Sequence, residues 1–252
     1  MKQKKNILIV TGGSRGIGKS VVEEALKKDW EVAIGYNSNK EKANEISEKS
    51  CGMAKIFEID LESKDSIEKF FNNIVKEMGM PSGLVNSGGV FQINDWIKDF
   101  DYNKLDKMMK INVTGLLFCC SQFAKIASVS NGGNGGCIVN VSSMAPTIGG
   151  RSGNSSYAAS KGAVDVFTAG AAKELAKEKI KVFAVRPAVT RTDMAKDRLA
   201  DEKTEASINK SIAIGRVAEP HEIARPIMEL FSESFNYASG SIINLSGGGF
   251  VI

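Results

Sequence analysis

The chain of 252 residues is 42% hydrophobic and 25% charged, enough apolar content to bury one large core. We therefore expect a single domain spanning residues 1–252. The formal net charge of +4 is small and the acidic and basic residues are interleaved, which disfavours a nucleic-acid-binding protein. No apolar run reaches the length of a membrane span or of a signal-peptide core, so the predicted location is cytoplasmic, away from any membrane.

The cysteine and histidine content disfavours a metal centre. The single histidine, His221, is far along the chain from the cysteines and follows Glu-Pro, a sequence typical of the first turn of a helix. None of the cysteines forms a CxxC pair, so we predict neither a metal site nor a disulfide framework. We expect all four thiols to be buried and apolar: Cys51, Cys119, Cys120 and Cys137.

Short β-branched apolar runs alternate with longer segments of helical spacing along the whole chain. Such alternation requires right-handed crossovers and predicts an α/β fold of the doubly wound Rossmann type, with a mostly parallel seven-stranded sheet and helices on both faces. In these sheets ligands bind at the carboxyl ends of the strands. The strands are predicted at residues 7–10, 32–34, 55–59, 83–85, 137–141, 181–185 and 241–245.

A glycine-rich turn follows the first predicted strand and precedes a helical pattern over residues 19–28. Glycine permits positive φ angles and lets a pyrophosphate approach the backbone N–H groups at the start of the helix. The position of the turn therefore predicts a dinucleotide site. Its candidate cofactor-binding residues are Thr11, Gly12, Ser14, Arg15, Gly16, Ile17 and Gly18.

The ends of the second and third strands bear on which dinucleotide binds. An acidic residue after the second strand would accept hydrogen bonds from the adenosine ribose and repel a 2′-phosphate, but this chain has Asn37 and Ser38 there. Since Arg15 could also pair with a phosphate, NADP is favoured over NAD. Asp60, followed by Leu61, ends the third strand, and Asp60 could contact the adenine or cap the helix that begins near residue 63.

Candidate catalytic residues follow the fifth strand. Ser142 and Ser143 close that strand, so a hydroxyl lies at the ligand-binding edge. Tyr157 and Lys161 are four residues apart in a helical pattern and therefore share one face. An ammonium beside a phenol favours the phenolate and lowers its pKa toward neutral pH, as general acid–base catalysis requires.

Several motifs in this order give the chain a resemblance to the short-chain dehydrogenase/reductase family. They are the turn at residues 11–18, Asn86-Ser-Gly-Gly89, Asn112, Ser143, Tyr157-x-x-x-Lys161 and Arg186-Pro187, and together they span the whole chain.

The resemblance implies that Tyr157 exchanges the substrate proton, that Lys161 lowers its pKa and holds the nicotinamide ribose, and that Ser143 binds the substrate oxygen. It implies that Asn112 positions a water, although bracing a helix is an equal alternative. We expect Asn86 to brace the sheet beside the cofactor and Ser142 to make a backbone contact. Among the cofactor contacts that the resemblance implies are Pro187 and Thr192, with Thr192 at the nicotinamide amide.

The chain departs from the family pattern at three places. Ser87-Gly88 replaces the usual Asn-Ala, Ala188 replaces the glycine that usually follows the proline, and residues 149–153 hold an extra residue. Ala188 could shift the cofactor, and a non-catalytic dinucleotide-sensing module is therefore an alternative to an enzyme. The intact set of catalytic residues disfavours that alternative.

The resemblance implies that the substrate is a carbonyl compound or an alcohol, and two substrate classes compete. The chain resembles both 3-oxoacyl-acyl-carrier-protein reductases and sugar-oxidising members such as glucose 1-dehydrogenases. An acidic carrier protein would need a basic patch, for which Arg151 and Arg191 are candidates. Residues 194–211 could form a substrate lid or a solvated helix, and three aromatic residues could line the cleft or pack in the core: Phe91, Trp96 and Phe100.

The resemblance also implies a homotetramer. Its expected contacts are the long helical segments near residues 101–128 and 155–179, together with the C-terminal strand. The apolar C-terminus at residues 249–252 would suit burial against a neighbouring subunit.

Overall fold

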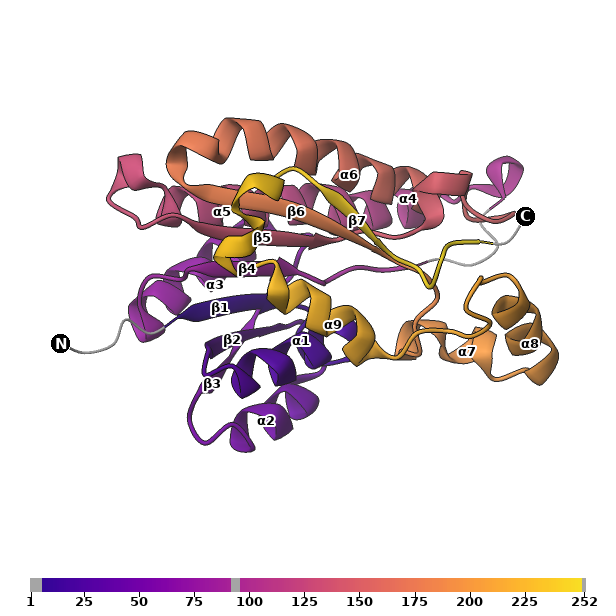
Figure 1. Cartoon of the computed structure of the whole chain (residues 1–252), viewed down its shortest axis with the longest axis horizontal. Coiled ribbons are helices and arrows are strands. Elements are labelled where there is room, and N and C mark those ends of the chain that lie inside the picture. Colours follow the sequence, from indigo (N-terminus) through magenta and orange to yellow (C-terminus); the bar gives the residue numbers. More distant parts are fainter. Residues whose placement is uncertain (1–5, 92–95, 251–252) are drawn as a thin grey trace.

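Seven strands form one sheet with the order β3-β2-β1-β4-β5-β6-β7, and every pairing is parallel (Figure 1). The computed structural model describes residues 6–91 and 96–250, so the end of the expected C-terminal contact lies outside the described residues. The doubly wound fold is confirmed, and each predicted strand lies within two residues of an observed one. The strands are β1 Ile7–Thr11, β2 Glu31–Tyr36, β3 Ala54–Glu58, β4 Gly83–Asn86, β5 Gly136–Val141, β6 Ile180–Pro187 and β7 Ile242–Leu245.

Helices cover both faces of the sheet because the central strands are apolar on both sides. In β1, Leu8 and Val10 face one core cluster and Ile9 faces the other. The first cluster also receives α1 (Gly16–Lys27), α2 (Lys40–Glu48) and α9 (Pro220–Glu229).

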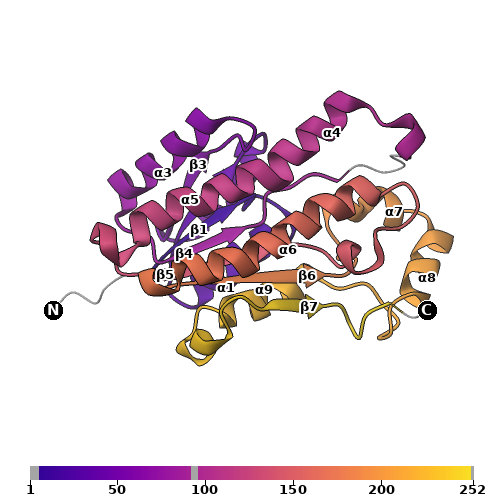
Figure 2. The same ribbon diagram turned by 90° about the horizontal axis from the view of Figure 1, so that it is seen from above.

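The second face carries α3 (Lys64–Met78), α5 (Leu116–Ala127) and α6 (Ser155–Leu175), which lie together above the sheet in Figure 2. α4 (Tyr102–Met109) continues into α5 through a π-helical segment, η2 (Lys110–Gly115), so the expected long helix near residues 101–128 is present with a π-turn in it. Such turns mark irregular points in helices and are frequent at functional sites.

Residues 194–211 contain two short helices, α7 (Lys196–Leu199) and α8 (Glu202–Lys210), which lie beyond the carboxyl ends of the strands (Figure 1). Ile208, Ile212 and Val217 form a small core of their own there. The remaining turns are single-turn 3₁₀ helices: η1 Ile97–Asp99, η3 Val129–Asn131, η4 Ala145–Ile148, η5 Ala176–Glu178, η6 Asp193–Ala195 and η7 Glu233–Ala238.

The expectation that all four cysteines are buried is wrong for Cys51. Cys51 is exposed, in the turn between α2 and β3 at a φ of 53°, where the chain reverses direction and cannot pack a side chain into the core. The other three are buried, and burial raises the pKa of Cys120 and of Cys137 to about 12. Among the described residues, no helix is both long and apolar enough to cross a bilayer.

Candidate active site

The glycine-rich turn forms a tightly closed backbone cradle at the end of β1. Gly12 and Gly16 have φ angles of +67° and +54°, which favour glycine. A Cβ on Gly18 would lie 2.2 Å from the Gly12 carbonyl oxygen, and a Cβ on Gly12 would lie 2.8 Å from Gly88 Cα. The turn therefore has no room for side chains and leaves its backbone open to a ligand, so the residues fit the pyrophosphate of a dinucleotide.

The remaining residues of the turn differ in exposure. Thr11 is buried, and its Oγ1 accepts a hydrogen bond from the Gly88 N–H at 3.3 Å, which ties the turn to the end of β4. Ser14 is also buried. Arg15 is exposed at the N-cap of α1, and among the described residues it has no carboxylate partner. Its free guanidinium beside the cradle suits a phosphate group.

The ends of β2 and β3 carry the expected polar residues. Asn37 and Ser38 are exposed after β2, and Asn37 Nδ2 donates to the Ile59 carbonyl at 3.3 Å. Asp60 Oδ1 accepts from the Glu62 N–H at 2.9 Å, forming a local turn. The alternative that Asp60 caps α3 is wrong, because Ser63 is the N-cap and accepts from the Ser66 N–H.

Leu61 packs against the end of β4. A Cβ on Gly88 would lie 2.8 Å from Leu61 Cδ1, and a Cβ on Gly115 would lie 2.3 Å from the Leu61 carbonyl oxygen. An alanine at position 88, as in the usual family pattern, would push Leu61 aside. The glycine found here thus matches the position of Leu61.

Asn86 braces the sheet as expected, through a buried polar ladder. Asn86 Nδ2 donates to Asn140 Oδ1 at 3.0 Å, and Asn140 Nδ2 donates to Thr168 Oγ1 at 3.0 Å. This ladder joins β4, β5 and α6 beneath the site. Asn140 and Thr168 were not predicted, because a single polar residue inside an apolar strand or helix gives no signal of its partner.

The two serines after β5 have distinct roles. Ser142 is buried, and its Oγ donates to the Lys161 carbonyl at 3.2 Å, the backbone contact that was expected. Ser143 is half-buried; its Oγ accepts from the Ala145 N–H at 3.1 Å and is hydrogen-bonded to Tyr157. The structure thus brings Ser143 and Tyr157 together at the carboxyl end of β5.

The protonation of Tyr157 differs from the expectation. Burial raises the pKa of Tyr157 to about 12, and its hydrogen bond with Ser143 offsets only part of this effect. The expected lowering of this pKa by Lys161 is not found, because Lys161 Nζ donates to the Val141 carbonyl at 2.8 Å. Burial in turn lowers the pKa of Lys161 to about 8, against a smaller raising effect of Asp165.

Asn112 lies in the π-helical segment η2, fully buried. Its amide makes both hydrogen bonds to the backbone of Val90, donating to the carbonyl at 2.9 Å and accepting from the N–H at 2.8 Å, and it also donates to Ser160 Oγ. Bracing a helix, the alternative role, is what these contacts show. A Cβ on Gly89 would lie 3.2 Å from Asn112 Oδ1 and 3.6 Å from Lys161 Nζ, so both groups border the same backbone.

The end of β6 contacts the serine loop and the glycine turn. The Met144 N–H donates to the Pro187 carbonyl at 3.0 Å. Ala188 is half-buried, and its N–H donates to the Leu245 carbonyl at 3.1 Å. Thr192 lies against the glycine turn, since a Cβ on Gly16 would lie 3.2 Å from Thr192 Cγ2.

The aromatic residues after β4 divide between the site and the surface. The ring of Phe91 meets that of Tyr157 edge-on, with centroids 4.7 Å apart, so Phe91 lines the site. Trp96 is half exposed, and Phe100 is half-buried beside the start of α4. The guanidinium of Arg198, from α7, lies over the ring of Phe91, 5.9 Å from its centroid.

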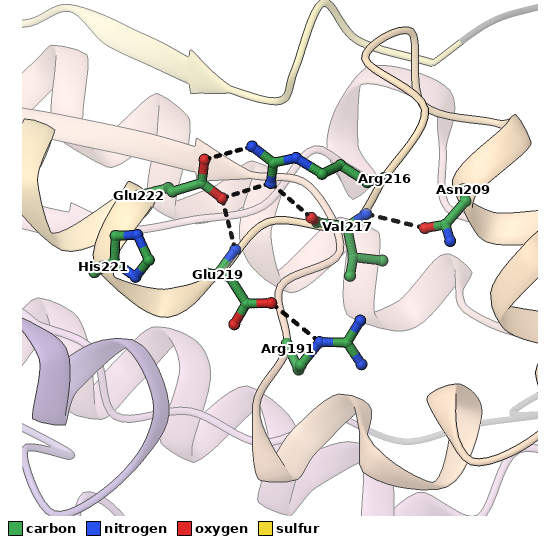
Figure 3. A pocket seen from close by; sticks show the side chains of 7 residues that line it. All are labelled: Arg191, Asn209, Arg216, Val217, Glu219, His221 and Glu222. Atoms are coloured by element: carbon green, nitrogen blue, oxygen red, sulfur yellow. Dashed lines mark hydrogen bonds and ion pairs between the residues drawn. The ribbon is translucent and has the colours of Figure 1, made fainter.

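A separate pocket of about 320 Å³ lies between α8 and the start of α9 (Figure 3). Its charges are already paired: Arg216 makes two 2.7 Å hydrogen bonds to Glu222, which lower the pKa of that carboxyl to about 2, and Arg191 Nε donates to Glu219. His221 is exposed at its rim in the first turn of α9. These ion pairs therefore stabilise the loop before α9, and the pocket that they line contains none of the predicted catalytic residues.

Comparison with known proteins supports the resemblance. Residues 12–249 match the family model described as Enoyl-(Acyl carrier protein) reductase. The chain is 34% identical over 252 residues to a 3alpha-hydroxysteroid dehydrogenase from Mediterraneibacter gnavus, with 98% of each chain covered. It is 31% identical over 251 residues to the 3-oxoacyl-(acyl-carrier-protein) reductase FabG from Staphylococcus aureus, with 98% of this chain and 99% of that one covered.

A solved structure of a variant of ElxO with NADPH bound has the same fold, with a TM-score of 0.87, 29% identity and 98% of each chain covered. The matches extend over nearly the whole chain and include enzymes named for reduction and for dehydrogenation. This chain is therefore an oxidoreductase of the short-chain dehydrogenase/reductase family.

Proposed function

We propose that the protein interconverts a ketone and a secondary alcohol with NADP as its cofactor. The observation that carries this proposal is the convergence of Ser143, Tyr157 and Lys161 at the carboxyl edge of the sheet, next to a turn that fits a dinucleotide. NADPH bound there would supply the hydride for the carbonyl carbon. Tyr157 would donate the proton to the carbonyl oxygen, giving the alcohol and NADP⁺, and Ser143 would hold that oxygen by a hydrogen bond.

The raised pKa of Tyr157 fits its proposed role as the proton donor when a ketone is reduced. With a pKa of about 12 the phenol is protonated at neutral pH, as a proton donor must be. Lys161, with a pKa of about 8, is mostly cationic at that pH and would hold the nicotinamide ribose. Asn112 would position a water beside Lys161, since the two side chains border the same backbone at Gly89.

The choice of NADP rests on charge. Exposed Arg15 would pair with the 2′-phosphate, while Asn37 and Ser38 leave no carboxylate to repel it. The remaining proposed cofactor contacts are Asp60 and Leu61 at the adenine, Asn86 and Pro187 along the cleft, and Thr192 at the nicotinamide amide. The NADPH in the ElxO structure supports the same cofactor.

The relatives support two substrate classes. The similarity to FabG supports a 3-oxoacyl thioester substrate, carried by an acyl carrier protein as partner. The similarity to the hydroxysteroid dehydrogenase supports a cyclic ketone or alcohol as substrate. The glucose 1-dehydrogenase-like alternative from the sequence is a third class. A homotetramer and a cytoplasmic location complete the proposal.

The test follows oxidation of NADPH and of NADH by the purified protein with acetoacetyl thioester, a steroid ketone and other ketones, and reduction of NADP⁺ with glucose. We expect turnover of a ketone with NADPH as the preferred cofactor. Tyr157→Phe should lower kcat by roughly 10²- to 10⁴-fold, the usual contribution of general acid–base catalysis, while the Kd for NADPH stays the same.

Ser143→Ala and Ser142→Ala form a matched pair for the same assay. Ser143→Ala should lower kcat strongly, because it removes the hydroxyl that meets Tyr157 and the substrate oxygen. Ser142→Ala removes only a backbone contact and should cost about 1 kcal/mol of stability with most of kcat retained. Full turnover by Tyr157→Phe with every substrate would refute the proposal.

A further inference from the structure

Two arginines near the carboxyl ends of the strands, Arg198 and Arg151, have no acidic partner among the described residues. Arg198 lies over Phe91, and Phe91 lies against Tyr157, so one aromatic ring contacts both the guanidinium and the catalytic ring. Arg151, from the loop before α6, donates to Ser211 Oγ at 2.7 Å and lies over the ring of Phe250. Among the described residues, neither guanidinium has an ion pair with a carboxylate.

Other arginines of this region do form ion pairs with carboxylates. Arg191 is held by Glu205 and Glu219, and Arg216 is held by Glu222. Arg198 is half-buried, and its pKa is lowered by burial first and by the positive charge of Arg151 second. An anion bound near Arg198 would offset both the burial of its charge and the repulsion by Arg151.

We propose, on the basis of the proposed function, that Arg198 and Arg151 bind an anionic group of the substrate, so that the enzyme acts on a compact carbonyl compound that carries a carboxylate. Arg198 and Tyr157 contact the same ring of Phe91 rather than each other, so the carboxylate would lie several bonds away from the reacting carbonyl. A guanidinium binds a carboxylate through two parallel hydrogen bonds and would fix the carbonyl relative to Tyr157. Arg198, from α7, and Arg151, from the loop before α6, are thus specificity-determining residues.

The proximity of Arg198 to Tyr157, through the ring of Phe91, favours a carboxylate over a distant phosphate. The same oxyanion chemistry could come from the phosphate of a phosphopantetheine arm, but that phosphate is many bonds away from the thioester carbonyl. A compact keto acid could reach Arg198 with its carboxylate while its carbonyl contacts Tyr157, because both side chains contact Phe91.

The experiment compares linear methyl ketones that end in a carboxylate, namely acetoacetate, levulinate and the next two homologues, with their methyl esters. We expect kcat/KM with NADPH to be at least 10-fold higher for one of the longer acids than for its ester. Arg198→Gln should lower kcat/KM for that acid by roughly 10- to 100-fold, mainly through KM, since a hydrogen bond to a charged group contributes about 1.5–3 kcal/mol. Turnover of the ester should change less than threefold.

Lys196→Gln is the matched control, because it removes the same charge from an exposed position of the same short helix. We expect it to leave the preference for the acid unchanged. Arg151→Gln should reduce the preference to a smaller extent, since Arg151 is the more exposed cation. Acetoacetyl-CoA and the uncharged acetoacetyl N-acetylcysteamine thioester form a second arm of the experiment. If Arg198→Gln lowers turnover of acetoacetyl-CoA alone, the bound anion is a phosphate and the proposal of a carboxylate is refuted.

Calorimetric titration of the NADP⁺-loaded protein with each acid and ester gives a readout that does not need turnover. Tighter binding of the acid that is lost in Arg198→Gln supports the proposal. Equal kcat/KM and equal binding for acids and esters would overturn it while ketone reduction stands. An equal loss for acid and ester in Arg198→Gln would also overturn it, by showing that Arg198 only supports Phe91. Loss of reduction for all ketones in the wild type would instead refute the proposed function.

Discussion

At the residue scale, burial sets the protonation of the two central groups in opposite directions. The phenol of Tyr157 is kept neutral, with a pKa of about 12, and the pKa of the Lys161 ammonium falls to about 8. Reduction of a ketone needs the neutral phenol and a cationic Lys161. The first proton lost as the pH rises is that of Lys161.

This order predicts the pH dependence of ketone reduction. We expect kcat/KM to be level below pH about 8 and to fall about tenfold per pH unit above it, because Lys161 loses its charge while Tyr157 remains protonated. The measurement is kcat/KM for a neutral ketone, with NADPH saturating at each pH, so that the charge of the substrate does not contribute. A profile that stays level to pH about 10 would show that the charge of Lys161 does not contribute to the reaction.

The positions of Ser143, Tyr157 and Lys161 could be predicted because each is fixed by a regular element. Ser143 follows a parallel strand, and the four-residue spacing of Tyr157 and Lys161 places them on one helix face. The pKa values of these residues could not be predicted, because desolvation depends on atoms from other segments of the chain. The contact of Arg198 with Phe91 could not be predicted either, since it joins segments more than 100 residues apart through irregular loops.

At the element scale, the strands were predictable and the interruption between α4 and α5 was not. Every strand is an apolar run of regular length, so the residues alone indicate it. The π-helical segment around Asn112 depends instead on the backbone of Val90, which the amide of Asn112 binds at both ends. The glycine turn was predictable in part. Its residues indicate a dinucleotide ligand, but they do not show how closely the backbone of the turn packs.

That packing predicts a specific effect of Gly18→Ala. The added methyl would lie 2.2 Å from the Gly12 carbonyl oxygen, so the turn must open, at a cost of about 1–3 kcal/mol of stability for such overpacking. We expect the Kd for NADPH to rise at least 10-fold, measured by fluorescence titration alongside urea unfolding.

Gly52→Ala is the matched control for Gly18→Ala. Gly52 has a φ of +83° with no atom within 4 Å of the added Cβ, so the substitution strains only the backbone, by about 1 kcal/mol. It should reduce stability and leave the Kd for NADPH unchanged. NADPH affinity of the wild-type level in Gly18→Ala would contradict the close packing of the turn.

At the scale of the whole molecule, α5 and α6 present a partly apolar surface that the described residues leave uncovered. A groove of about 330 Å³ runs between them, and on α6 the side chain of Val166 is 76% exposed. These are the helical segments expected to hold a homotetramer together. The groove is lined by Leu117, Cys120, Ser121, Ala124, Lys125, Ser128, Asn131, Phe167, Ala171, Glu174 and Leu175.

The proposed assembly predicts that Val166→Glu dissociates the protein. A carboxylate buried without a partner in an interface costs several kcal/mol, so the association constant should fall by roughly 100-fold or more. Sedimentation velocity over a range of concentrations measures this directly, with a tetramer expected for the wild type and smaller species for the variant. Met80→Glu is the control, since Met80 is also exposed, at 42%, but follows α3 outside the α5–α6 surface, and its tetramer should persist. Val166 is exposed and follows Tyr157 by nine residues in α6, which places it on the opposite side of the helix. A monomeric wild type or an intact tetramer in Val166→Glu would therefore remove α6 from the interface without affecting the assignment of the catalytic residues.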